Sequence, residues 1–112
     1  MTKHRRRIYS LAMDIESAAE QLEALGNATR LAIFIELVHA GEEGVQVGEI
    51  REKLDIPAST LSHHITKLVH SGLMTQQRLG RSLVCRAAFN TMDSLIMFLA
   101  NNCCAEDSEI WG

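Results

Sequence analysis

The feature that most constrains the fold is a pair of short helical segments joined by a tight connection and followed at once by two β-compatible segments. The first helical segment spans 47–54, and its apolar residues share one face. The second, ASTLSHHITKLVHSG, follows Pro57, a residue suited to the first turn of a helix. Spacings of four and three place Leu61, Ile65 and Leu68 on its inner face. This order predicts a helix-turn-helix.

The segments LMTQQRL and SLVCRAAF, residues 73–79 and 82–89, are short and β-compatible. Gly80 and Arg81 lie between them, as in a two-residue hairpin turn. A helix pair followed by a hairpin predicts a winged helix-turn-helix, mainly α with a small β-hairpin.

Helical patterns also occupy 14–25, with Ile15 and Leu22 on its apolar face, and 28–40, where Asn27 is a candidate N-cap. A last helix is expected in TMDSLIMFLANNCC, with Asn90 as its cap. The length of 112 residues suits one compact domain. We therefore expect a domain over 13–104, between a basic arm over 1–12 and a polar tail over 105–112.

Composition indicates a soluble, cytoplasmic protein with no membrane partner. No apolar run approaches the length of a membrane span, and no signal peptide is recognisable. Three cysteines, an odd number, favour free thiols in a reducing compartment over a disulfide framework. Neither a glycine-rich phosphate loop nor a Cys-x-x-Cys motif is present, which argues against an enzyme.

The net charge of −3 conceals a basic segment. Residues 51–86 carry six lysines and arginines but two acidic residues, so this part of the chain can attract an anion. On the second helix of the pair, the outward positions offer small polar groups that can bond to DNA base edges: Ser59, Thr60, Ser62 and His63. Lys67, Arg78 and Arg81 are expected to meet phosphates or a minor groove. Each of these residues also has a purely structural interpretation. Ser59 and Thr60 could serve only to cap the helix, and Arg78 and Arg81 could lie in a solvated turn. The neighbouring His64 is expected to be a packed core residue.

These segments carry a resemblance to a known family. IPASTLSHHITKLVHSGLM, the following QRLGRSLVCRA, and ALGNATRLAIFIELV resemble the ArsR/SmtB family of metalloregulatory repressors over about 14–104. The resemblance implies a homodimer formed through the first and last helices, with a DNA-binding and dimerisation domain in each chain. It also implies two recognition helices that read an inverted repeat in double-stranded operator DNA until an inducer releases them.

The family's inducer sites differ in their fit to this sequence. Where some members have a cysteine motif, this chain reads Val45, Gln46, Val47, Gly48, and its last helix has Asp93 but no histidine for a zinc site. The pair Cys103 and Cys104 resembles the arsenic-responsive members. Those members often have a third cysteine a few residues later, and the tail AEDSEIWG has none.

The remaining cysteine, Cys85, is a candidate to complete the set of thiol ligands. Alternation places it on one strand face with Leu83, Ala87 and Phe89, and if that face is buried, Cys85 points inward. Cys103 continues a stripe of Met92, Ile96 and Leu99, whereas Cys104 is rotated by about 100°. Our hypothesis is that Cys85 and Cys103 form the core of the inducer site, from one chain or across the dimer, with Cys104 as third ligand or bystander.

Cysteine thiolates suit trivalent arsenic, a soft inducer, and no permanently bound cofactor is expected. Two thiols favour a methylated arsenical, and three would permit arsenite or antimonite. Alternatives are a redox-sensing repressor with a disulfide from Cys85 to Cys103 or Cys104, an enzyme using vicinal thiols, and a protein-interaction module that has lost DNA binding.

Overall fold

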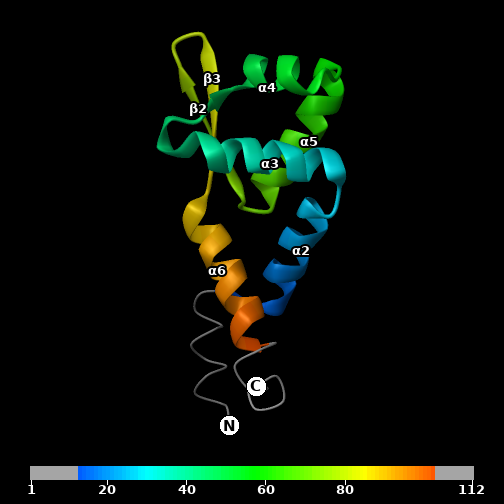
Figure 1. Ribbon diagram of the computed structural model, residues 1–112, viewed down its shortest axis with the longest axis vertical. Helices are drawn as coiled ribbons and strands as arrows, with labels where there is room; N and C mark the ends of the chain where they lie inside the picture. Colours follow the sequence, from blue (N-terminus) through cyan, green and yellow to red (C-terminus); the bar gives the residue numbers. More distant parts are fainter. Residues whose placement is uncertain (1–12, 103–112) are drawn as a thin grey trace.

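The computed structural model describes residues 13–102 (Figure 1). The predicted arm, Cys103, Cys104 and the tail lie outside these residues. The elements, in chain order, are α2 (Ile15–Leu25), α3 (Ala28–Ala40), the 3-10 turn η1 (Gly41–Glu43), β1 (Val45–Gln46), α4 (Val47–Leu54), α5 (Ala58–His70), β2 (Met74–Leu79), β3 (Ser82–Ala87) and α6 (Phe89–Ala100). The predicted winged helix-turn-helix is confirmed, with α4 and α5 as the helix pair.

Short polar side chains begin α2 and α3. Asp14 Oδ1 accepts a hydrogen bond of 2.7 Å from the backbone N–H of Ser17, and Asn27 Oδ1 accepts one of 3.0 Å from that of Arg30. Each bond satisfies a backbone donor that lacks a partner in the first helical turn. The cap predicted at Asn27 is therefore confirmed.

The sheet is antiparallel, in the order β1-β3-β2. Leu79 pairs with Ser82 across the predicted turn, and Gly80 has a φ of 63°. The strand β1 is not predicted from the sequence, because two residues are too few to show alternation. Gly44 precedes β1 with a φ of 74°, and a Cβ there would lie 2.6 Å from the carbonyl oxygen of Cys85. A glycine is needed for this close approach.

One apolar core joins the helix pair to the hairpin. Its fully buried members come from α3, α4, α5, both hairpin strands and the residue before them: Ile33, Leu37, Ile50, Leu61, Leu68, Leu73, Met74 and Cys85. Burial of these side chains fixes α5 relative to β2 and β3.

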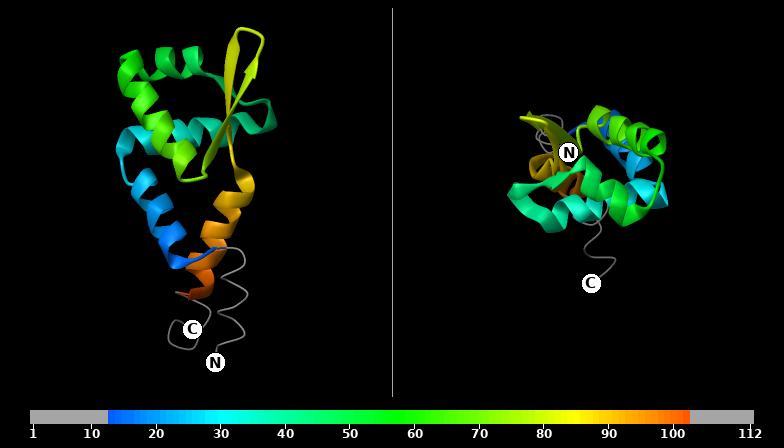
Figure 2. Two further views of the ribbon diagram at one scale, coloured as in Figure 1. Left: turned by 180° about the vertical axis from the view of Figure 1, so that it is seen from behind. Right: turned by 90° about the horizontal axis from the view of Figure 1, so that it is seen from above.

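The helices α2 and α6 converge at the opposite end of the molecule from the hairpin tip (Figure 2). A smaller cluster of Met13, Ala18 and Leu95 joins them. The apolar stripes predicted for these helices are buried only in part: Ala18 is buried and Leu25, Met92 and Leu99 pack against the clusters. Ile15, Leu22 and Ile96 are 73%, 44% and 55% exposed. Each helix therefore buries one part of its apolar surface against the rest of the chain and leaves the other part exposed.

The start of α6 also differs from the prediction. The helix begins at Phe89 after Ala88, which has no side chain able to cap it, rather than after Asn90. The backbone enters the helix directly from β3, and Ala88 N–H donates a 2.8 Å bond to the carbonyl of Leu73 instead.

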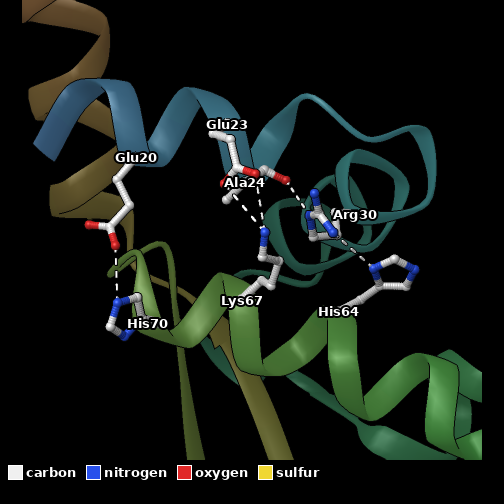
Figure 3. Close-up of polar contacts among 7 residues, drawn as sticks. All are labelled: Glu20, Glu23, Ala24, Arg30, His64, Lys67 and His70. Atoms are coloured by element: carbon white, nitrogen blue, oxygen red, sulfur yellow. Dashed lines mark hydrogen bonds and ion pairs between the residues drawn. The ribbon is translucent and has the colours of Figure 1, made fainter. Parts of the chain in front are cut away.

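Arg30 joins three helices at a buried corner (Figure 3). Its Nε donates a 2.7 Å bond to the carbonyl of Ala24, in the last turn of α2, where helix carbonyls lack partners. Its Nη1 lies 3.2 Å from Nδ1 of His64 on α5. A guanidinium only donates, so His64 Nδ1 must accept, and the ring is neutral with its hydrogen on Nε2. His64 is thus the packed core residue that the sequence allowed.

The pKa of His64 lies below its ordinary value of 6.5 because the ring is buried and because Arg30 and His63 place positive charge beside it. Its protonation would remove the acceptor for Arg30 and set two cations together. The unfolded chain therefore binds this proton more readily than the folded chain. The contribution to stability is complete above pH 6.5 and is lost as the pH falls toward the folded pKa.

We predict that His64→Asn weakens the acid sensitivity of the fold. The asparagine oxygen can accept from Arg30 but does not titrate, so the variant should lose less unfolding free energy than the wild type between about pH 7.5 and about pH 5. At neutral pH the substitution should lower the free energy of unfolding by roughly 1 kcal/mol, because the packing of the ring is lost. Urea unfolding at each pH measures this, and parallel losses in both proteins would contradict it.

Candidate nucleic-acid interface and thiol site

The outer face of α5 carries the predicted DNA-reading residues. Ser59, Thr60, Ser62 and His63 are all exposed, whereas Leu61 is buried in the core on the opposite side. The helix packs through its inner face and leaves a stripe of hydroxyl and imidazole groups open. Such groups can exchange hydrogen bonds with base edges if the helix enters a major groove.

The structure adds Thr66 to this stripe. It is exposed and lies one turn beyond Ser62, at a spacing of four residues. Thr66 is not among the residues predicted from the sequence, although its spacing from Ser62 is a signal that could have identified it. Its hydroxyl extends the polar face toward the C-terminal half of α5.

Lys67 lies on the flank of this stripe, toward α2. Its Nζ is 3.1 Å and 3.5 Å from the two carboxylate oxygens of Glu23. One turn further, Nε2 of His70 is 3.1 Å from Oε2 of Glu20. Lys67 is therefore held by an acidic residue of α2, and a contact with phosphate would have to displace that residue.

Arg78 and Arg81 are exposed at the hairpin tip, Arg78 near the end of β2 and Arg81 in the turn. Within residues 13–102 neither forms an ion pair with an acidic side chain. The tip and the start of α5 lie at the same end of the molecule (Figure 1). The polar stripe and both arginines can thus meet one extended ligand.

Cys85 is fully buried in β3, the central strand. Burial raises the pKa of its thiol, and a 3.7 Å contact from Nε2 of Gln76, its cross-strand neighbour, partly opposes that effect. The inward orientation on which the thiol hypothesis depends is therefore present. The same burial keeps the thiol protonated and poorly reactive at rest.

The end of α6 lies far from Cys85 within one chain. The helix has 12 residues from Phe89 to Ala100, about 18 Å at 1.5 Å per residue, and it runs away from the sheet (Figure 1). Cys103 and Cys104 follow this end in the sequence but lie outside the described residues. The structure thus leaves Cys85 and the described end of α6 apart.

Residues 13–102 lack two kinds of feature, a cluster of metal-binding side chains and a membrane-spanning helix. No group of three or more histidine, cysteine or acidic side chains is arranged to hold a metal ion in this range. The helices of the same range are all too short or too polar to cross a membrane.

The chain is similar to known regulators. A helix-turn-helix domain family matches residues 25–77. A Halobacterium salinarum protein, provisionally named as the arsenical resistance operon repressor ArsR, is 34% identical over 67 residues, which cover 60% of this chain and 51% of that protein. The chain thus spans about half the length of this curated relative.

Solved structures share the fold. The ArsR-like transcriptional regulator from Rhodococcus sp. RHA1 is 20% identical, with a TM-score of 0.71 over 85% of this chain and 87% of that chain. The transcriptional repressor BigR from Xylella fastidiosa is 25% identical, with a TM-score of 0.59 over 93% of this chain and 98% of that chain. The domain match and the curated relative show that the chain is similar in sequence to helix-turn-helix regulators of the ArsR type, and the solved structures show the same winged helix-turn-helix fold.

Proposed function

We propose that the protein is a DNA-binding transcriptional repressor that leaves its operator when a trivalent arsenical binds its cysteine thiolates. The observation that carries the DNA-binding part is the placement of α5's polar stripe and the two hairpin arginines at one end of a shared rigid core. In this arrangement α5 enters the major groove, where small side chains allow close approach. Arg78 and Arg81 bind phosphates or the adjacent minor groove.

The protein acts as a homodimer through α2 and α6. These helices expose Ile15, Leu22, Ile96 and Met97, with exposed fractions from 44% to 73%. Contact between two copies would remove these apolar side chains from water. A two-fold axis then relates the two α5 helices, which suits an operator with an inverted repeat.

The inducer belongs to the class of soft trivalent arsenicals. The name of the Halobacterium relative, which refers to arsenical resistance, supports this class. The three cysteines of this chain supply thiolates, the ligands that such species prefer. A methylated or other organic arsenical, which needs two sulfurs, fits a core of Cys85 and Cys103; arsenite or antimonite would require Cys104 as well.

We infer that each site is formed across the dimer. Because α6 runs away from the sheet, its end cannot readily meet Cys85 of the same chain. In a dimer whose α6 helices run antiparallel, the end of one α6 lies beside the start of the other, and Phe89 at that start follows β3 closely. Cys85 of one protomer and Cys103 of its partner can then hold one arsenic atom.

Such a site couples the inducer to the wing. Cys85 is fully buried and lies opposite Gln76, so a bound metalloid must shift β2 or β3 to reach the thiol. Arg78 belongs to β2 and would move with that strand. An arsenical that binds the shifted arrangement more tightly lowers DNA affinity by its differential affinity for the two states.

A redox-sensing repressor is the less favoured reading. Oxidation by peroxide proceeds through an accessible thiolate, and Cys85 is buried with a raised pKa. Peroxide added without arsenical should therefore leave the DNA complex intact.

Arg78→Ala and Arg81→Ala test the wing. Each should reduce the slope of log affinity against log salt by about 0.9, the value for one lost phosphate contact, because both side chains are exposed and unpaired within residues 13–102. Lys53→Gln is the control, since Lys53 is already paired with Glu36 at 2.9 Å. Fluorescence anisotropy with labelled duplex measures the slopes, and slopes equal to that of the wild type would exclude a wing contact with phosphate.

Mixed dimers test the cross-protomer site. A dimer of one Cys85→Ser protomer and one Cys103→Ser protomer retains one complete site if the ligands come from two chains, and none if they come from one. We expect about one methylarsenite per mixed dimer and none for either variant homodimer, each of which should still bind DNA. Mass spectrometry under native conditions counts the bound arsenic.

Two outcomes would overturn this arrangement. A mixed dimer that binds no arsenic would place both ligands in one chain. Release of the Cys85→Ser homodimer from DNA by arsenical would remove Cys85 from the site.

A further inference from the structure

Polar bridges join α2 to the DNA-reading helix α5 (Figure 3). The bridge from Ala24 through Arg30 to His64 is buried. The contacts of Glu23 with Lys67 and of Glu20 with His70 are exposed, with side-chain exposures of 64% for Glu23 and 37% for Lys67. An exposed ion pair contributes little to stability, so these two contacts can open at small cost.

A groove of about 450 Å³ separates the helices here. Its lining includes Glu20, Glu23, His63, Thr66, Lys67 and His70. The side chains thus meet across an open groove rather than in a packed interface. The hydroxyl of Thr66, on the proposed DNA-facing stripe, shares this lining with Lys67.

The acidic side chains lie on one side of the groove and their nitrogen-bearing partners lie on the other. Both carboxylates come from α2, and the lysine and histidine come from α5. A carboxylate beside an ammonium offers two negative oxygens, as a DNA phosphate does. When α5 lies in a groove of DNA, a phosphate close to the flank of α5 competes with Glu23 for the same Nζ.

We propose that Glu23 is an internal competitor of DNA phosphate: it occupies Lys67 and lowers the affinity of the protein for DNA. This rests on the proposed DNA-binding function. DNA of any sequence must displace Glu23 before it gains the Lys67 contact. The competitor therefore lowers the affinity for operator and for non-operator DNA alike, because both must displace the same carboxylate. Glu23 is a positioning residue that acts through Lys67.

The experiment is a double-mutant cycle on DNA binding with Glu23→Gln, Lys67→Met and the double variant. The probe is a fluorescein-labelled duplex of mixed sequence, measured by anisotropy from about 50 mM to about 200 mM salt. Glu16→Gln is the matched control, because it removes the same charge from the exposed first turn of α2. Thermal unfolding of each variant shows that the fold is intact.

Glu23→Gln should steepen the salt slope by about 0.9, one additional phosphate contact, and make the affinity loss over this salt range about 3-fold larger. Lys67→Met alone should change the slope little, since Lys67 is already occupied. In the Lys67→Met background, Glu23→Gln should have no effect beyond that of Glu16→Gln.

Three results would decide against the proposal. An equal gain from Glu23→Gln with and without Lys67 would show a general charge effect, and an unchanged slope would show that no contact was released. In both cases the protein still binds duplex, and the proposed function stands. If the wild-type protein binds no duplex at any salt concentration, the proposed function fails and this inference fails with it.

Discussion

The position of the DNA-reading helix depends on the buried contact of Arg30 with the end of α2 and with His64. A guanidinium in a nearly dry corner is tolerated because the Ala24 carbonyl and the His64 ring each accept one of its hydrogen bonds. The contact simultaneously satisfies an orphan carbonyl of α2 and orients α5. It requires a neutral histidine on the helix that carries the polar stripe, so the geometry of the DNA-reading face is linked to one protonation state.

The shared core extends this order from α5 to the wing. Leu61 and Leu68 pack in the same cluster as Met74 and Cys85, so the hairpin arginines and the α5 hydroxyls belong to one rigid unit. Cys85, a proposed inducer ligand, lies buried within that unit. A small displacement of β3 would also move the hairpin and α5, because a close-packed interior transmits strain to neighbouring elements.

The polar contacts between α2 and α5 contrast with this core. These contacts line an open groove, and their side chains remain partly exposed. Exposed ion pairs of this kind are weak, so an anionic partner could replace the carboxylate. The outward apolar residues of α2 and α6 form the other unfinished surface of the chain. In the proposed function, DNA would contact the first surface and a second copy of the chain would cover the second.

Local patterns by themselves determined much of the fold. Periodicity and turn residues predicted α4, α5 and the hairpin, the cap at Asn27 and the exposed stripe from Ser59 to His63, because these depend on residues close together in the sequence. Tertiary structure alone decided the pairing of β1 with β3, the exposure of Ile15, Leu22 and Ile96, the ion pair of Lys67 with Glu23 and the separation of Cys85 from the end of α6. Each of these depends on how distant segments pack, and a helical or strand period shows which residues share a face but not what that face will meet.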